Sequence, residues 1–160
     1  MNPLLALLGT PLVAAVILAI LPSYRLAARI NVAASFLTFL AGLALFEARP
    51  APSLLLFVDD FNIYLVALTA FVGFTTSVFS ASYIDHEIET GRLNPVHFRF
   101  YHSMYQILSF GMALALVANN IGVMWVAVEV ATLATVVMVS LYRTHEAIEA
   151  SWKYFILASV

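Results

Sequence analysis

Long apolar runs separated by short polar breaks form the main pattern of this chain. Five of the runs have the length that a helix needs to cross a bilayer, about 20 residues. They cover residues 4–21, 26–46, 61–84, 98–118 and 121–141. A sixth apolar run follows the polar segment "YRTHE" and continues to the last residue. The pattern therefore predicts an all-α integral membrane protein with about six transmembrane helices.

Two of the polar breaks indicate how the chain turns. The segment "EARPAPS" contains two prolines, which remove amide donors and bias the preceding residues to extended conformations. The following "LLLFV" is too short to span and suits a short strand or an interfacial segment. Residues 107–141 would reach about 50 Å as one helix, so a turn is needed, and Asn119-Asn120 is the polar break. Because asparagine tolerates left-handed geometry, we predict a tight turn there.

Composition supports a bilayer as the solvent and excludes several kinds of function. Of the 160 residues, 63% are hydrophobic and 10% are charged, against about 25% charged in a typical soluble domain. The chain has no cysteine, which excludes disulfides and thiolate metal sites, and its net charge of -2 gives no electrostatic reason to expect nucleic acid. The four histidines never occur at a metal-binding spacing within the apolar runs, so neither metal nor haem is expected.

The cations predict the orientation of the helices. If the N-terminus lies outside, six of the seven cations fall in or beside inner loops, namely Arg25, Arg29, Arg92, Arg99, Arg143 and Lys153. Only Arg49 falls outside, which is a positive-inside bias. This topology predicts three N-terminal helices within residues 1–84, a cytoplasmic loop at 85–97, and three further helices within 98–160.

One acid interrupts the fifth apolar run. Glu129 lies in "VMWVAVEVATLA", about eight residues into the span and roughly 12 Å from its outer end, near the membrane midplane. A charge at the centre of a bilayer costs about 2.5 to 3.5 kcal/mol on insertion scales, so such a residue faces protein or water and indicates function. We interpret Glu129 as a proton-transfer group. The alternative is a protonated carboxyl that hydrogen-bonds a neighbouring helix as a structural contact.

Hydroxyl residues follow this acid along the same helix. Thr132, Thr135 and Ser140 continue from Glu129 toward the inner side and keep to broadly the same face. They predict that Glu129 is hydrated from the cytoplasmic half, while the outer half of the helix is dry. Hydroxyls that simply bond back to helix carbonyls would give the same pattern, and the sequence leaves both alternatives open.

A second polar set lies in the fourth span. His102, Gln106 and Ser109 share a helix face and could extend a proton path, because histidine exchanges protons near neutral pH. More often such residues hydrogen-bond a neighbouring helix, and we favour that interpretation. Small and polar residues at helical spacing also predict close packing of the second and third spans: Asn31, Ser35, Thr38 and Gly42 in one, and Thr69, Gly73, Thr76 and Ser80 in the other.

Lys153 is the second charged candidate. It lies in the early part of the sixth helix, where the helix dipole disfavours a cation, so a compensating partner is expected. Glu149 lies four residues earlier, the favourable order for an ion pair, and Thr144 suits the start of this helix. Either Lys153 forms an interfacial salt bridge with Glu149, or it is an internal charge that biases the proton affinity of Glu129.

The last quarter of the chain carries motifs of a known family. "NNIGVMWVAVEVATLATVVMVSLYRTHEAIEASWKYFILASV", residues 119–160, resembles the F membrane subunit of hydrogenase-4 and of related formate hydrogenlyase complexes. More broadly it is similar to the antiporter-like subunits of respiratory complex I and of multisubunit sodium/proton antiporters. The specific parts are "NN", "WVAVE", "SLYRT" and "EASWKYFIL". "VDDFNIYLVALTAFVGFTTSVFSASYI" resembles the third helix of the family more loosely.

This resemblance implies a fold and a role. Such subunits have about fourteen helices, including two inverted five-helix repeats with a broken helix in each. They carry no redox cofactor, and they pass protons or sodium ions while partner subunits perform the redox reaction. The resemblance therefore implies a multi-pass protein of the bacterial inner membrane that contacts lipid and other membrane subunits of its complex. It also implies that Glu129 matches the mid-membrane glutamate of the family, and Lys153 a lysine in the next helix.

The resemblance covers only part of such a subunit. It implies that the chain is a fragment, with three N-terminal helices plus three of the first repeat, and that the glutamate's usual lysine partner would follow Val160. The sequence departs from the family at Val130-Ala131, where Ala-Thr is expected, and this removes one hydroxyl beside the acid. Two other functions stay open: a truncated or structural membrane subunit that docks partners without conducting ions, and a stand-alone secondary antiporter.

Overall fold

The computed structural model describes residues 2–91 and 95–159, without the side chains of 95–99. This part of the chain forms six helices: α1 (Pro3–Ile20), α2 (Tyr24–Ala44), α3 (Asn62–Glu89), α4 (Pro95–Val117), α5 (Ile121–Ser140) and α6 (His145–Ser159). The side chains of Arg92, His97 and Arg99 lie outside the description. The orientation that two of these cations help to predict therefore stays a prediction.

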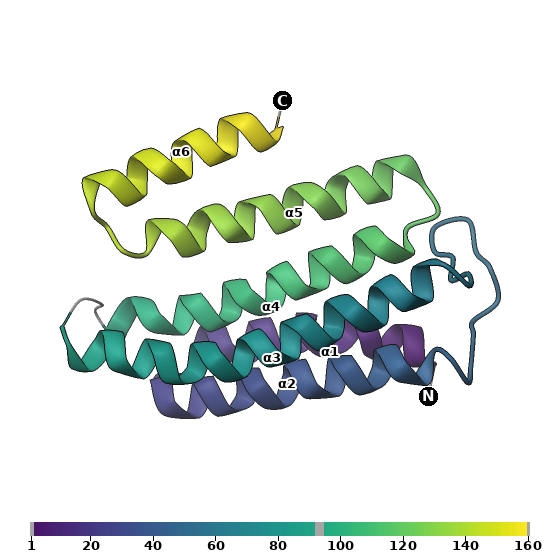
Figure 1. Cartoon of the computed structure of the whole chain (residues 1–160), viewed down its shortest axis with the longest axis horizontal. Coiled ribbons are helices and arrows are strands. Elements are labelled where there is room, and N and C mark those ends of the chain that lie inside the picture. The colour runs from purple at the N-terminus through teal and green to yellow at the C-terminus, as the bar shows by residue number, and fades with distance from the viewer. Residues whose placement is uncertain (1, 92–94, 160) are drawn as a thin grey trace.

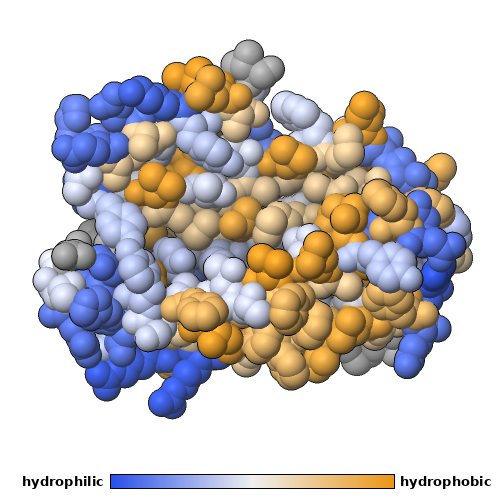
Figure 2. Space-filling model, in the orientation of Figure 1, coloured by the Kyte–Doolittle hydropathy of each residue, from blue (hydrophilic) through white to orange (hydrophobic). Residues whose placement is uncertain are grey.

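Helices α1 to α4 form a bundle, with α5 packed on α4 and α6 packed on α5 (Figure 1). Apolar residues cover the middle of the molecule and hydrophilic residues gather at both ends of the helices (Figure 2). Within the described residues, α1 to α5 are long and apolar enough to cross a membrane. The predicted all-α membrane fold is confirmed. The sixth predicted span is present as α6, whose 15 described residues are fewer than the roughly 20 that a span needs.

The loop predicted at residues 85–97 is shorter in the structure. α3 continues past the first charges to Glu89, and Ile84 packs against Tyr24 of α2 and Tyr101 of α4, which holds this part of the helix against the bundle. The helix ends at Thr90, whose amide bonds back to the last turn, and at Gly91, whose φ of 72° suits a residue without a Cβ. Charge alone therefore placed the end of this helix too early.

The segment between α2 and α3 is tied to the turn between α4 and α5. Leu56 and Ala118 form an isolated antiparallel bridge. The Phe57 amide donates to the Val117 carbonyl oxygen beside it at 2.8 Å, and Asn119 adds main-chain and side-chain bonds to the same segment. Of the two alternatives left open for "LLLFV", the structure therefore shows a short extended segment that is paired with the α4–α5 turn.

Asn120 begins α5 as its N-cap. Its side-chain Oδ1 accepts hydrogen bonds from the amides of Gly122 at 2.9 Å and Val123 at 3.3 Å. The turn predicted here is confirmed, but Asn120 does not use the left-handed geometry that asparagine tolerates, since it is extended with φ -133° and ψ 130°. Among the described non-glycine residues, only Arg143 has a positive φ, of 50°. The asparagine is used for its acceptor, which satisfies amides that have no partner inside the helix.

Replacing Asn120 with alanine is expected to lower the free energy of unfolding by about 1 kcal/mol, because two amides at the start of α5 lose their acceptor. Thermal unfolding of the full-length protein in detergent, followed by circular dichroism, measures the effect. Asn120→Ser is the matched control, since serine caps a helix about as well as asparagine. Equal stability of the alanine and wild-type proteins would contradict the capping role.

α4 and α5 lie close together at Gly111. A Cβ placed on this residue would lie 2.9 Å from the carbonyl oxygen of Ala127 and 3.0 Å from the amide nitrogen of Ala131. Only glycine fits at these distances, and small residues let helices approach closely in lipid, where the hydrophobic effect does not join them. The contact fixes which side of α5 faces α4, and therefore where the remaining side chains of α5 point.

Candidate functional site

Glu129 lies in the middle of α5, as the ninth of its 20 residues, and is half-buried. Ala127 and Ala131, on either side of it, face α4 at Gly111. At about 100° per residue, Glu129 projects from the opposite side of the helix, the side toward α6. There its Oε1 accepts a hydrogen bond from the Ser159 hydroxyl at 3.0 Å. The predicted depth of the acid along the helix is confirmed, and the structure adds its direction.

Ser159 was not among the predicted site residues, although the sequence contains the signal. α5 and α6 form an antiparallel hairpin that turns near residue 144 (Figure 1). Residues equally far from the turn lie at the same level, and Glu129 precedes residue 144 by 15 positions while Ser159 follows it by 15. Counting outward from Thr144, the predicted start of the sixth helix, therefore places the two residues at the same level, but does not give the helix face on which either lies.

The three hydroxyl residues that follow Glu129 all donate to carbonyls of their own helix. Thr132 and Thr135 do so at 3.0 Å each, and Ser140 at 2.8 Å. Of the two alternatives left open by the sequence, bonding back to the helix is what the described side chains show. Each oxygen keeps its capacity to accept a hydrogen bond from water, so hydration of this side of α5 stays a prediction.

Lys153 forms an ion pair with Glu149, at 2.5 Å between Nζ and Oε1. The Lys153 side chain is 70% exposed, and exposed pairs of this kind contribute only about 0 to 1 kcal/mol. In the hairpin, Lys153 lies at the level of residue 135, six residues and about 9 Å along the axis from the level of Glu129. Thr144 starts the helix as predicted, by accepting a hydrogen bond from an amide of the first turn. The structure thus pairs Lys153 with Glu149 rather than with Glu129.

The predicted polar residues of α4, His102, Gln106 and Ser109, lie toward α2 and α3 and away from α5. Gln106 Nε2, which carries two hydrogens, lies within hydrogen-bond distance of three acceptors: the Asn31 carbonyl oxygen at 3.1 Å, Asn31 Oδ1 at 2.8 Å and Ser35 Oγ at 2.9 Å. Gln106 and His102 have no exposed surface. The favoured interpretation, hydrogen bonds to a neighbouring helix, is confirmed for Gln106. The structure does not bring His102 and Gln106 to Glu129, because Gly111 of the same helix is the residue that contacts α5.

The small residues of α2 and α3 pack as predicted. A Cβ on Gly42 would make ordinary contacts of 3.7 Å with side chains of α3. The carbonyl oxygen of Gly73 accepts a hydrogen bond from the Tyr105 hydroxyl of α4. In the part of the chain that the structure describes, no three His, Cys, Asp or Glu residues are placed to hold a metal ion.

Five membrane-length helices, one of them with a half-buried carboxyl group at its centre, define a multi-pass all-α membrane protein. The chain is 53% identical over 150 residues to a protein of Methylacidiphilum infernorum (isolate V4) described as a hydrogenase-4 component F homolog. The resemblance to hydrogenase-4 component F that the motifs predict is thereby confirmed. The match covers 94% of this chain and 32% of the relative, so the chain spans about a third of that relative's length. No protein-family model and no solved structure matches the chain.

Proposed function

We propose that this chain is part of an ion-translocating, antiporter-like membrane subunit of a group 4 hydrogenase, or of a related complex I-like oxidoreductase, in the bacterial inner membrane. Redox chemistry belongs to partner subunits, and this subunit carries protons without a redox cofactor of its own. The observation that carries the proposal is Glu129, a half-buried acid at the centre of an apolar helix, in a chain 53% identical to a hydrogenase-4 component F homolog.

Glu129 is the residue that takes up and releases the proton in this proposal. A carboxylate in an apolar helix needs compensation, and the Ser159 hydroxyl supplies one hydrogen bond. A cation close to the acid favours its charged form, and removal of that cation favours the protonated form. Proton uptake and release therefore follow from the opening and closing of an ion pair at Glu129, which redox steps in partner subunits would drive.

Lys153 is the cation that this chain itself offers for that ion pair. It would have to leave Glu149 and reach about 9 Å along the hairpin. Because the Lys153–Glu149 pair is exposed, breaking it costs little, at most about 1 kcal/mol. Lys153 is therefore proposed as a charge partner that exchanges between the two acids.

Proton access to Glu129 is proposed from the end of α5 that leads into α6. Thr132, Thr135 and Ser140 supply oxygens that can accept hydrogen bonds from water along this half of the helix. In the other half, Ile121 and Trp125 expose large apolar side chains, 80% and 65% of their surface. This asymmetry supports a hydrated half and a dry half.

A scan with single cysteines is expected to show this asymmetry. The chain has no cysteine of its own, so Thr132→Cys and Thr135→Cys can be compared directly with Ile121→Cys and Trp125→Cys. In vesicles of the full-length protein, a membrane-impermeant thiol reagent added on the proposed cytoplasmic side is expected to label positions 132 and 135 faster. Leu133→Cys is the control for depth, because this exposed side chain lies at the same level on another face. Labelling of 121 and 125 but not of 132 and 135 would contradict inner access.

The proposed function is tested by reconstituting the full-length subunit with its complex in liposomes that contain a pH indicator. Redox turnover is expected to move protons across the membrane, and a protonophore is expected to abolish the signal. Redox turnover without any pH change would contradict the proposal and would favour a subunit that only docks partners. Sodium-dependent exchange in the absence of redox turnover would instead indicate a stand-alone antiporter.

A further inference from the structure

A pocket of about 340 Å³ lies among α2, α3 and α4, on the side of α4 that faces away from α5. Arg25 and Arg29 of α2 and Asp85 of α3 line it, close to the ends of their helices. Its wall toward the middle of the bundle includes His102, which has no exposed surface. The pocket is thus a polar opening from the bundle end into the interior.

One turn beyond His102 along α4, two buried polar atoms have no hydrogen-bond partner among the described groups. They are Oε1 of Gln106 and Nδ2 of Asn31, and both residues have no exposed surface. Rotating both amides by half a turn exchanges the acceptor and the donor, and leaves the same two positions without a partner. Buried polar groups in folded proteins are almost always hydrogen-bonded, to ordered water where no protein group is available. A water molecule can donate to one such atom and accept from the other.

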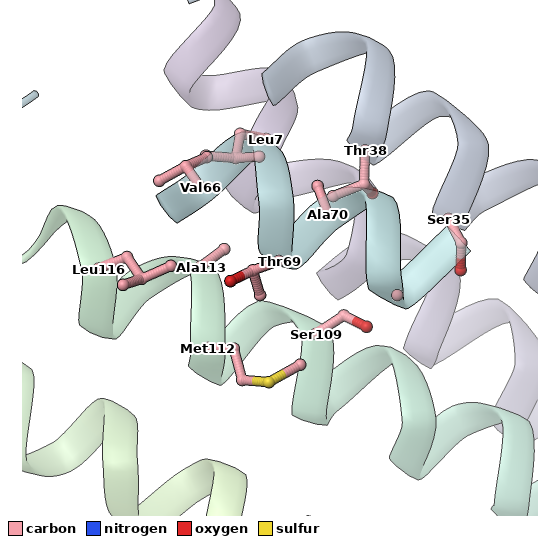
Figure 3. A pocket seen from close by; sticks show the side chains of 11 residues that line it. Leu7, Ser35, Thr38, Val66, Thr69, Ala70, Ser109, Met112, Ala113 and Leu116 are labelled. Carbon is pink, nitrogen blue, oxygen red and sulfur yellow. The ribbon is translucent and has the colours of Figure 1, made fainter. Parts of the chain in front are cut away.

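A cavity of about 20 Å³ lies further along the same face of α4 (Figure 3). About 10 to 15 Å³ is enough for one water molecule, provided that polar partners surround it. Most of the cavity wall is apolar, and four side chains add hydroxyls to it: Ser35 and Thr38 of α2, Thr69 of α3 and Ser109 of α4. Thr38 and Ser109 each donate to a carbonyl of their own helix, so their oxygens can accept hydrogen bonds from a water molecule.

Shared residues connect the three places. His102 lines the pocket and lies one turn from Gln106 on α4. Ser35 accepts a hydrogen bond from Gln106 and also lines the cavity. We propose that the pocket, the two amides and the cavity form one internal chain of bound water, here called the polar column, which admits water and protons into the four-helix bundle. From His102 to Ser109 it extends seven residues, or about 10 Å, along α4.

The polar column is separate from the path proposed for Glu129. Its residues lie on the side of α4 that faces α2 and α3, whereas Gly111, on the other side of α4, packs closely against α5. Glu129 points away from that contact, toward Ser159 of α6. The chain therefore holds two routes for water, one in the bundle and one along α5 and α6. This inference concerns bound water in the four-helix bundle, so it can fail while the proposed role of Glu129 holds. Equally, the role of Glu129 can fail while the polar column holds.

Cryo-electron microscopy of the intact complex, at a resolution that shows ordered water, tests the polar column. Water density is expected beside the Asn31 and Gln106 amides and in the cavity. The double variant Thr69→Val with Ser109→Ala removes two hydroxyls with little change of shape, and is expected to lose the cavity density. Thr75→Val is the matched control, because Thr75 of α3 does not line the cavity and bonds only to its own helix.

A map that shows ordered water elsewhere in the bundle, but none at the two amides or in the cavity, would overturn the polar column. So would cavity density that is unchanged in the double variant. As a second measurement, solid-state NMR of the full-length protein in bilayers can detect transfer of magnetisation from water to the Gln106 side-chain amide. Transfer at Gln106 is expected in the wild-type protein, and its absence would equally contradict the inference.

Discussion

Replacing Glu129 with glutamine is expected to abolish proton translocation by the full-length protein in its complex, while assembly stays intact. Glutamine has the size of glutamate and keeps an acceptor for the Ser159 hydroxyl, but it cannot bind and release a proton at this position. Loss of a positioned proton-transfer group costs roughly 10² to 10⁴-fold in rate. Proton uptake by inverted membrane vesicles, driven by redox turnover, measures the effect.

Two further variants separate the role of Glu129 from general effects of charge and contact. Glu146 is an exposed acid in the first turn of α6, so Glu146→Gln is expected to leave proton uptake unchanged. Ser159→Ala keeps the acid and removes one hydrogen bond, worth about 0.5 to 1.5 kcal/mol, so a change of about tenfold at most is expected. Normal uptake by the Glu129→Gln protein would refute the proton-transfer role.

The helices were predictable because a membrane span is defined by the length of its apolar run. The polar break at Asn119-Asn120 was also sufficient to divide an apolar stretch that was too long for one span. The predicted end of α3 is too early: Ile84 packs against Tyr24 of α2 and Tyr101 of α4, and the helix continues past its first charges. Charge marks where a helix can leave the apolar region, and contacts between helices decide where it ends.

The depth of Glu129 was predictable because the rise per residue of a helix is fixed. Its direction was not, because an apolar helix gives no signal of which side meets which neighbour. That information lies in Gly111, whose contact with Ala127 and Ala131 turns the opposite side of α5 toward α6. Ala131, where the family resemblance predicts threonine, lies at the same contact. A hydroxyl added at this position would lie on the side of α5 away from Glu129.

Replacing Gly111 with alanine is expected to destabilise the packing of α4 on α5. The new Cβ would lie 2.9 Å from the carbonyl oxygen of Ala127 and 3.0 Å from the amide nitrogen of Ala131. Both are backbone atoms, which cannot turn away as the end of a side chain can, so the two helices would have to separate. Overpacking of this kind typically costs about 1 to 3 kcal/mol. Thermal unfolding of the full-length protein in detergent measures the loss.

Gly9→Ala is the matched control for the Gly111 variant, because a Cβ on Gly9 in α1 meets no atom within 4 Å. It is expected to be neutral, or to stabilise α1 by about 0.5 to 1 kcal/mol, since glycine weakens a helix interior. Adding Ala131→Gly to Gly111→Ala removes only the 3.1 Å contact with the Ala131 side chain, so rescue should be partial. Full recovery of stability would show that the Ala131 side chain alone causes the clash with the new Cβ at position 111. Equal stability of Gly111→Ala and Gly9→Ala would contradict the close approach of α4 and α5 at Gly111, and with it the contact that directs Glu129 toward α6.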